Sequence, residues 1–276
     1  MKNSGKILLL VFCLFFAFII NGNCQTQDDT KTDWKSDGLI GKVKSIKTVK
    51  YIINDTSGEI LPGEIKCSES AEYNENGGKI ESDDQYSNNS KYKYDDKNKS
   101  VECTTLKLDK SINVIISKFD AKGNETATYK KCPNDSIILR TIVKNVYDEK
   151  ENLIEKSINN SDGSLNYKYT YKYDDKGNMI EKCGSCCGNY SDKRIYIYNE
   201  KGIAIEMSFY NSNGKLETNE KYDDKGNLIE MTWYKPNGKK ISGKSSIQYE
   251  YDQKGNWIKS IQKDGPYITL REIVYY

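Results

Sequence analysis

The stretch Tyr222-Asp223-Asp224-Lys225-Gly226-Asn227-Leu228-Ile229-Glu230 decides the fold, because it carries a complete hairpin signal. Asp223 can cap a tight turn, and Gly226 supplies the positive φ that closes a loop built on a type I turn. Tyr222 precedes the loop and Ile229 follows it, and an aromatic residue that faces a β-branched one stabilises neighbouring antiparallel strands. The stretch therefore predicts two strands joined by a tight turn.

The same pattern recurs along most of the chain, at intervals of about 21 to 29 residues, which is a spacing typical of repeat arrays. Its copies begin at Tyr73, Tyr94, Phe119, Tyr147, Tyr173, Tyr198, Tyr222 and Tyr251, and additional turns follow Tyr210 and Tyr234. Residues between the turns alternate with period two, as in Tyr167, Tyr169, Tyr171 and Tyr173. This alternation is typical of half-buried antiparallel strands.

These patterns predict an all-β fold of tandem antiparallel β-hairpin repeats that form an elongated, twisted meander or spiral sheet. We expect a single domain over residues 33–276, with an N-terminal cap at 33–63 and the repeats at 64–276.

The first residues have the features of a signal peptide, which we place at residues 1–24. Lys2 and Lys6 precede an apolar run from 7 to 20, which is shorter than a membrane-spanning helix needs. Cleavage before Gln25 is one route of processing, and lipidation of Cys24 is the other. Residues 24–29 resemble the acidic tether of surface-exposed lipoproteins of the Bacteroidetes group, so we favour lipidation and take 25–32 as a flexible tether.

The expected location is therefore outside the cytoplasm. The chain is predicted to be either an outer-membrane or cell-surface lipoprotein, or a secreted or periplasmic protein. Membrane contact is expected only through a lipid anchor at Cys24.

The charge distribution argues against a nucleic-acid partner. Lysine and arginine number 42 against 40 acidic residues, and the two signs alternate along the chain without a basic face. Histidine is absent, which removes the commonest general base and the commonest metal ligand. The sequence indicates no cofactor and no metal.

The repeated unit Tyr-x-Tyr-Asp-x-x-Gly-Asn-x-Ile resembles the YD or Rhs (rearrangement hot spot) repeat. The resemblance runs from about Tyr73 to Tyr276 and is best around Tyr171 and Tyr249. It implies a secreted or surface β protein whose longer relatives form a shell around a toxin. Asn178, Asn227 and Asn256 stand where the family usually has arginine, so the resemblance implies fold and compartment rather than activity.

A cysteine cluster at 183–188 is the most unusual local feature. Cys183, Cys186 and Cys187 are disulfide candidates, because an exported chain is expected to form disulfides. The Cys-x-x-Cys spacing also suits a thiolate metal site or a redox dithiol. Neither a histidine nor a second such pair is present to complete a zinc site.

The aromatic residues give the functional hypothesis. Tyrosine suits a sheet face that is partly wet, with the ring packed and the hydroxyl hydrogen-bonded. Trp233, Trp257, Tyr169 and Tyr171 are the predicted ligand-binding residues, and the two tryptophans are expected to be the most exposed. We therefore expect a non-catalytic binding or scaffold module for a glycan or a surface protein.

Two alternatives stay open. A glycoside hydrolase needs only two carboxylates, but the repeated turn aspartates are explained by turn capping. A remnant of a toxin-shell protein is the other, through the Rhs resemblance. No catalytic residue is assigned.

Overall fold

The computed structural model describes residues 33–54, 61–84, 88–97, 99–186, 189–263 and 265–276, which form one short helix and an 18-stranded sheet. The helix is α1 (Asp33–Ser36). The strands are β1 (Val43–Asn54), β2 (Leu61–Tyr73), β3 (Lys79–Asp84), β4 (Asn88–Asp95), β5 (Ser100–Lys107), β6 (Ile112–Phe119), β7 (Glu125–Lys131), β8 (Ile137–Tyr147), β9 (Leu153–Asn160), β10 (Leu165–Tyr173), β11 (Met179–Cys186), β12 (Asn189–Tyr198), β13 (Ala204–Tyr210), β14 (Leu216–Tyr222), β15 (Leu228–Tyr234), β16 (Ile241–Tyr251), β17 (Trp257–Gln262) and β18 (Tyr267–Tyr275). None of the described residues belongs to a helix long and apolar enough to cross a membrane.

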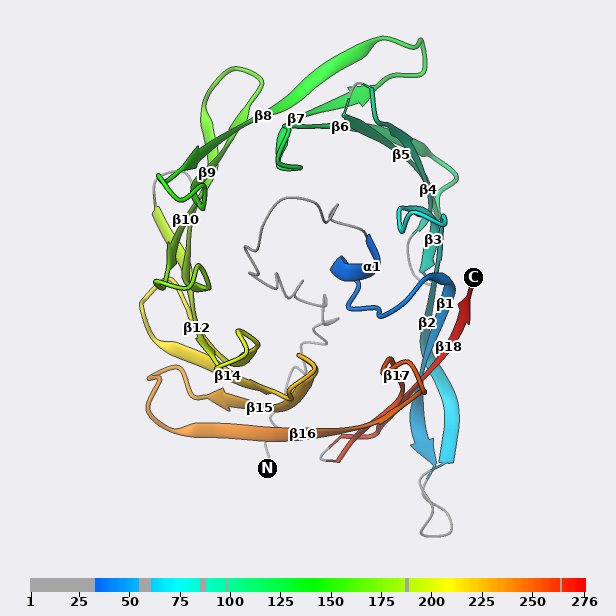
Figure 1. Ribbon diagram of the computed structural model, residues 1–276, viewed down its shortest axis with the longest axis vertical. Coiled ribbons are helices and arrows are strands. Elements are labelled where there is room, and N and C mark those ends of the chain that lie inside the picture. Colours follow the sequence, from blue (N-terminus) through cyan, green and yellow to red (C-terminus); the bar gives the residue numbers. More distant parts are fainter. Residues whose placement is uncertain (1–32, 55–60, 85–87, 98, 187–188, 264) are drawn as a thin grey trace, which may run out of the picture.

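The strands form a closed antiparallel barrel (Figure 1). Each strand pairs with its neighbours in sequence, and β1 pairs with both β2 and β18. The β1–β18 ladder runs from the pair Val43 and Tyr275 to the pair Ile52 and Tyr267. The all-β class and the antiparallel hairpins are confirmed. The prediction of an open meander or spiral is wrong. Its two edge strands would have been β1 and β18, and these form backbone hydrogen bonds with each other.

The turns of the repeat have the predicted chemistry. Gly226 has a φ of 83°, and Asp223 Oδ1 accepts hydrogen bonds from the backbone N–H groups of Lys225 (3.0 Å) and Asn227 (2.8 Å). Asp174 caps its own turn in the same way, toward Lys176 and Asn178. The aspartates therefore serve the turns, as their repetition indicated.

The expected pairing differs by one residue across most of the turns, whereas Tyr94 faces Val101 as expected. Tyr222 faces Leu228 rather than Ile229, because the register shifts between Lys221 and Tyr222. Tyr173 likewise faces Met179. The extra residue of such a bulge lies at the turn and moves every following pair by one position.

One face of the sheet lines the interior of the barrel, and we call it the inner wall. Figure 1 shows α1 within the ring of strands, and its Trp34 packs with Leu39, Val43, Ile46 and Tyr73 in the buried core cluster. Tyr73 therefore points inward. Because side chains alternate along a strand and the register is continuous, this assignment extends around the barrel.

The opposite face, the outer wall, carries cross-strand pairs of opposite charge. Lys168 contacts Glu155 at 2.7 Å, and Lys172 contacts Glu181 at 2.7 Å. Lys221 and Lys244 both contact Glu230, at 3.2 Å and 2.8 Å. The outer wall is thus a solvated, charge-paired surface in this part of the barrel.

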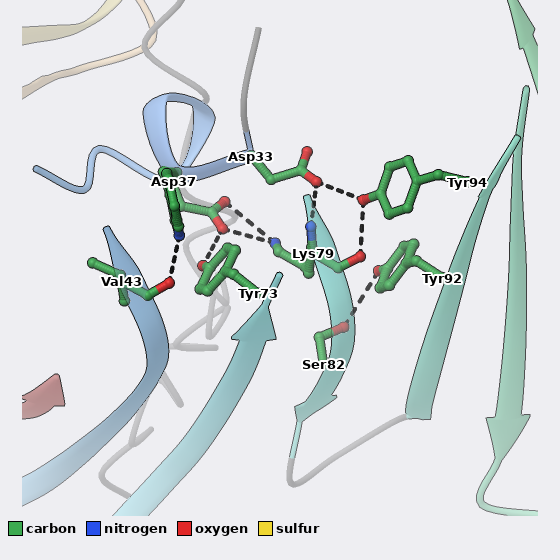
Figure 2. A network of polar contacts seen from close by, with 9 residues as sticks. Asp33, Asp37, Val43, Tyr73, Lys79, Ser82, Tyr92 and Tyr94 are labelled. Atoms are coloured by element: carbon green, nitrogen blue, oxygen red, sulfur yellow. Dashed lines mark hydrogen bonds and ion pairs between the residues drawn. The ribbon is translucent and has the colours of Figure 1, made fainter. Parts of the chain in front are cut away.

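The helix α1 is fixed to the inner wall by Asp33 at its start and by Asp37, the residue directly after its end (Figure 2). Asp37 accepts a hydrogen bond from Tyr73 Oη and forms an ion pair with Lys79 at 2.9 Å. Asp33 Oδ2 accepts from the backbone N–H of Lys79 and from Tyr94 Oη, each at 2.6 Å. The stretch expected as an N-terminal cap thus contributes both this internal helix and β1, which closes the barrel.

Candidate functional site

A row of polar and aromatic residues crosses the inner wall from β10 to β15. Its members lie opposite one another in register, and each is half-buried. They are Tyr171, Lys182, Arg194, Phe209, Thr218 and Trp233, which we call the inner row. The inner row includes two of the predicted ligand residues, Tyr171 and Trp233, at its opposite ends, but does not bring them into contact, because five interstrand spacings of about 4.8 Å separate them.

The tyrosines of β10 form a continuous aromatic strip beside the inner row. The ring centroids of Tyr167 and Tyr169 are 4.6 Å apart, and those of Tyr169 and Tyr171 are 6.4 Å apart. Burial raises the pKa of both Tyr169 and Tyr171, so both phenols are neutral at physiological pH. The strip presents neutral aromatic rings to the barrel interior.

Two cations lie side by side next to this strip. Lys182 and Arg194 are direct cross-strand partners. The ammonium of Lys182 is 4.5 Å from the centroid of Tyr169, and the guanidinium of Arg194 is 5.7 Å from that of Phe209. Burial, and then the charge of Arg194, lower the pKa of Lys182.

An acidic group near these cations is Asp192, which lies two residues before Arg194 on the same wall. Its Oδ1 accepts hydrogen bonds from Tyr167 Oη and Ser191 Oγ, each at 2.9 Å. Gly184 leaves the room for this cluster, since a Cβ there would be 2.5 Å from both Asp192 Oδ1 and Tyr167 Oη. The wall therefore has a hydrogen-bonded polar cluster beside the cation pair.

The two predicted tryptophans have different environments. Trp233 is half-buried, and its ring would lie 3.5 Å from a Cβ at Gly243, across the β15–β16 pair. Trp257 is only 8 % exposed, because its ring packs at a tilt against that of Tyr249, with centroids 5.6 Å apart, and the guanidinium of Arg271 lies 3.5 Å from its centroid. The prediction that Trp257 is exposed is wrong. It was based on the position of Trp257 directly after a turn, which does not reveal that Arg271 of β18 covers the ring.

The sequence missed Lys182, Arg194 and Phe209 as members of the site. Their proximity depends on the register across three strands, which no local pattern shows. One signal was available: Arg194 is an arginine in a chain whose basic residues are nearly all lysine.

The cysteine cluster is only partly described. Cys183 carries a free thiol on the outer wall, and burial raises its pKa. Cys186 points to the other face of β11, opposite Tyr167, so these two cysteines do not bond to each other here. Cys187 and Cys24 lie outside the described residues, and a disulfide in the cluster stays a prediction. Among the described residues, no group of three or more acidic or cysteine side chains could hold a metal ion.

One carboxyl of the inner wall has unusual surroundings. Glu220 accepts a hydrogen bond from Tyr222 Oη, and burial raises its pKa. It lies beside Met207 and Met231 on the adjacent strands, both buried. It is the carboxyl on which a hydrolase hypothesis would have to rest.

Comparisons with known proteins give a partial family match and remote structural similarities, and none of them indicates an activity. A family model described as "Protein of unknown function (DUF2963)" matches residues 209–262. No curated protein sequence matches the chain. The chain is similar in structure to porin-like proteins from Bacteroides uniformis (TM-score 0.45, 10 % identity, 84 % of this chain and 96 % of that one) and Bacteroides vulgatus (TM-score 0.37, 10 % identity, 85 % and 98 %). It is also similar to the structure titled TcdB2-TccC3-TEV (TM-score 0.35, 12 % identity, 82 % and 14 %). Likenesses this weak carry no inference about function.

The resemblance to YD or Rhs repeat proteins is wrong. The family model that matches is a different one, and the strands close into an 18-stranded barrel. The physical reason is that Tyr-Asp-x-x-Gly is turn chemistry, which any series of antiparallel hairpins can use. The toxin-shell alternative rested on that resemblance and is withdrawn with it.

Proposed function

We propose that the protein is a non-catalytic binding protein that holds a saccharide against the inner wall of its barrel. The observation that carries this proposal is the strip of tyrosines with Trp233 on a wall that is only half-buried. Barrels of 16 to 18 strands are too wide for wall side chains to fill. Aromatic rings that face such an interior offer flat apolar surface with a polar tip, which suits recognition of a ring-shaped, hydroxyl-rich ligand.

The outer wall supports an aqueous setting for this barrel. Barrels embedded in lipid carry an outward-facing apolar band, and charges on that face are destabilising. Here Lys168, Lys172 and Lys244 on the outer wall are paired with glutamates. We propose that the barrel stands in water outside the cytoplasm, and that a lipid on Cys24 attaches it to the envelope.

The experiment is a glycan-array screen of the mature chain, followed by titration of each ligand found. Tyr169→Ala and Trp233→Ala should each weaken binding by about tenfold, since loss of one aromatic contact is worth about 1 kcal/mol or more. Tyr210→Ala is the matched control, because Tyr210 pairs with Lys193 on the outer wall. The proposal fails if no saccharide binds, or if the control weakens binding as much as the inner-wall variants.

A further inference from the structure

We propose that Lys182 and Arg194 form an anion-binding subsite of the inner wall, which takes the carboxylate of an acidic saccharide such as a uronic-acid residue. This inference rests on the proposed saccharide binding and names the class of saccharide. It starts from the direct opposition of two cations across β11 and β12.

Like charges that face each other across a strand pair destabilise a sheet. The outer wall pairs opposite charges at several such positions, since Lys172 faces Glu181 and Lys221 faces Glu230, although Glu72 faces Glu81 across β2 and β3. On the inner wall, Lys182 faces Arg194 instead. An unfavourable pairing of two cations on a half-buried part of the wall indicates that they serve a function there.

The aromatic neighbours hold the cations without neutralising them. Lys182 lies over the rings of Tyr169 and Tyr171, at 4.5 Å and 5.9 Å from their centroids. Arg194 lies 5.7 Å from the centroid of Phe209. Cation–π contacts position a cation but leave its full charge, so both groups can still attract an anion.

Neither cation has a carboxylate within ion-pair distance among the residues that the structure describes. Asp192 and Glu220 are the acidic residues of this region. Asp192 already accepts hydrogen bonds from Tyr167 and Ser191, and burial raises the pKa of Glu220, while the charge of Arg194 lowers it. Lys156 is a third cation, whose charge lowers the pKa of Lys182, so three cations lie beside two acidic groups. A net positive charge remains on this part of the wall.

The geometry favours a carboxylate on a sugar ring. A guanidinium presents a planar fork that binds a carboxylate through two parallel hydrogen bonds, and an ammonium adds a third donor group. The rings of Tyr169 and Tyr171 lie next to this pair, so a sugar ring could stack there while its carboxylate reaches the cations. One ligand residue would then use both features of the wall.

The test compares a charged ligand with its neutral counterpart. Trigalacturonate and its methyl ester are titrated into the mature chain by calorimetry, together with a sulfated trisaccharide. The acid should bind at least about tenfold more tightly than the ester, since a hydrogen bond to a charged group contributes more than one to a neutral group. Raising the salt concentration should reduce this difference.

Substitutions test whether Lys182 and Arg194 cause the preference for the acid over the ester. Arg194→Gln and Lys182→Gln should each reduce the affinity for trigalacturonate toward that for the ester, and leave the ester's affinity unchanged. Lys182→Arg should retain the preference because it retains the charge. The matched control is Lys193→Gln, which removes a cation from the outer wall of the same strand. The unfolding midpoint of Lys182→Gln should not fall, because the repulsion is relieved, whereas a purely structural role would lower it.

The outcomes separate this inference from the proposed function. Equal binding of acid and ester by the wild-type chain overturns the subsite and leaves saccharide binding intact, and so does an equal loss in Lys193→Gln and Arg194→Gln. Preference for the sulfated ligand over the carboxylate overturns the assignment of the anion. Absence of binding to every saccharide overturns the proposed function itself. The wild-type comparison decides the matter even if a variant does not fold.

Discussion

The phenol of Tyr251 donates a hydrogen bond to Asp223, whose Oδ2 lies 2.6 Å away, and thereby ties β16 to the turn between β14 and β15. Asn227 of the same turn donates to that phenol at 3.0 Å. Tyr147 is bonded in the same way to Asp120, at 3.0 Å. Each of these aspartates thus caps its own turn with one oxygen and accepts from the next hairpin with the other.

This arrangement predicts that Tyr251 and Asp223 stabilise the barrel jointly. Tyr251→Phe and Asp223→Asn should each reduce the free energy of unfolding by about 1 kcal/mol, the usual net contribution of a hydrogen bond. The double variant should lose less than the sum, because both changes remove the same bond. Urea denaturation of the four proteins measures this coupling. Tyr210→Phe is the control, since the hydroxyl of Tyr210 makes no hydrogen bond within the described residues. If the losses of Tyr251→Phe and Asp223→Asn were strictly additive in the double variant, the hydrogen bond between the two residues would not contribute to stability.

The same link predicts a loss of stability at alkaline pH. Burial, together with the hydrogen bond to Asp120 and its charge, raises the pKa of Tyr147 to about 12. An unfolded tyrosine ionises near pH 10. The native state therefore binds more protons than the unfolded state between these two pKa values, so the stabilisation is complete below about pH 10 and lost as the pH rises toward 12.

Tyr147→Phe should accordingly flatten the decline of the unfolding free energy between pH 10 and 12, measured by denaturation at several pH values. Tyr210→Phe should leave the decline as it is in the wild-type chain. An unchanged slope in Tyr147→Phe would show that this phenol ionises normally in the folded barrel.

The sequence predicted the hairpins well where the turn chemistry is explicit. Turns with a glycine after Tyr-Asp or Tyr-Asn were found, such as the one closed by Gly226. Turns at the other end of the barrel were missed where a non-glycine residue takes the positive φ, as Lys110 does at 63° and Asp135 at 61°. The deciding signal was the aromatic residue before the turn. The turn after Tyr147 was found although Glu151 takes the positive φ, and the turn closed by Gly163 was missed because no aromatic residue directly precedes it.

Closure of the barrel could not be predicted from local patterns. It depends on the pairing of Ile46 with Ile273 and of Val49 with Leu270, which lie at opposite ends of the chain. The inner-wall position of Tyr169 and Tyr171 follows from alternation alone. Which residues of other strands lie beside them depends on the register, and this is why the cation pair was not foreseen.

Docking of α1 inside the barrel predicts a large stability effect for Trp34. Its ring is 9 % exposed, and Nε1 donates to the carbonyl of Val43 at 2.7 Å. Trp34→Ala should reduce the free energy of unfolding by about 3–5 kcal/mol, and Trp34→Phe by less, because it retains most of the buried surface. Ile40→Ala is a nearby control at an exposed position. Wild-type stability of Trp34→Ala would show that the helix is not docked in solution.

Attachment through Cys24 predicts how the protein partitions between phases. In membranes from cells that express the whole chain, the wild-type protein should enter the detergent phase of a phase separation. Cys24→Ser should move to the aqueous phase, because a lipid chain contributes about 0.8 kcal/mol per buried methylene and the outer wall is charged. Equal partitioning of the two proteins would exclude the anchor.

Glu220 allows the binding and hydrolase hypotheses to be separated. A glycosidase acid needs a raised pKa, and burial provides this for Glu220. In a binding protein, Glu220→Gln should leave saccharide affinity and the folded state largely unchanged, because the amide can still accept the hydrogen bond from Tyr222. No reducing ends should appear when either protein is incubated with the saccharides it binds. Turnover by the wild-type chain that falls by orders of magnitude in Glu220→Gln, with an intact circular dichroism spectrum, would establish the enzyme and end the proposal of a non-catalytic barrel.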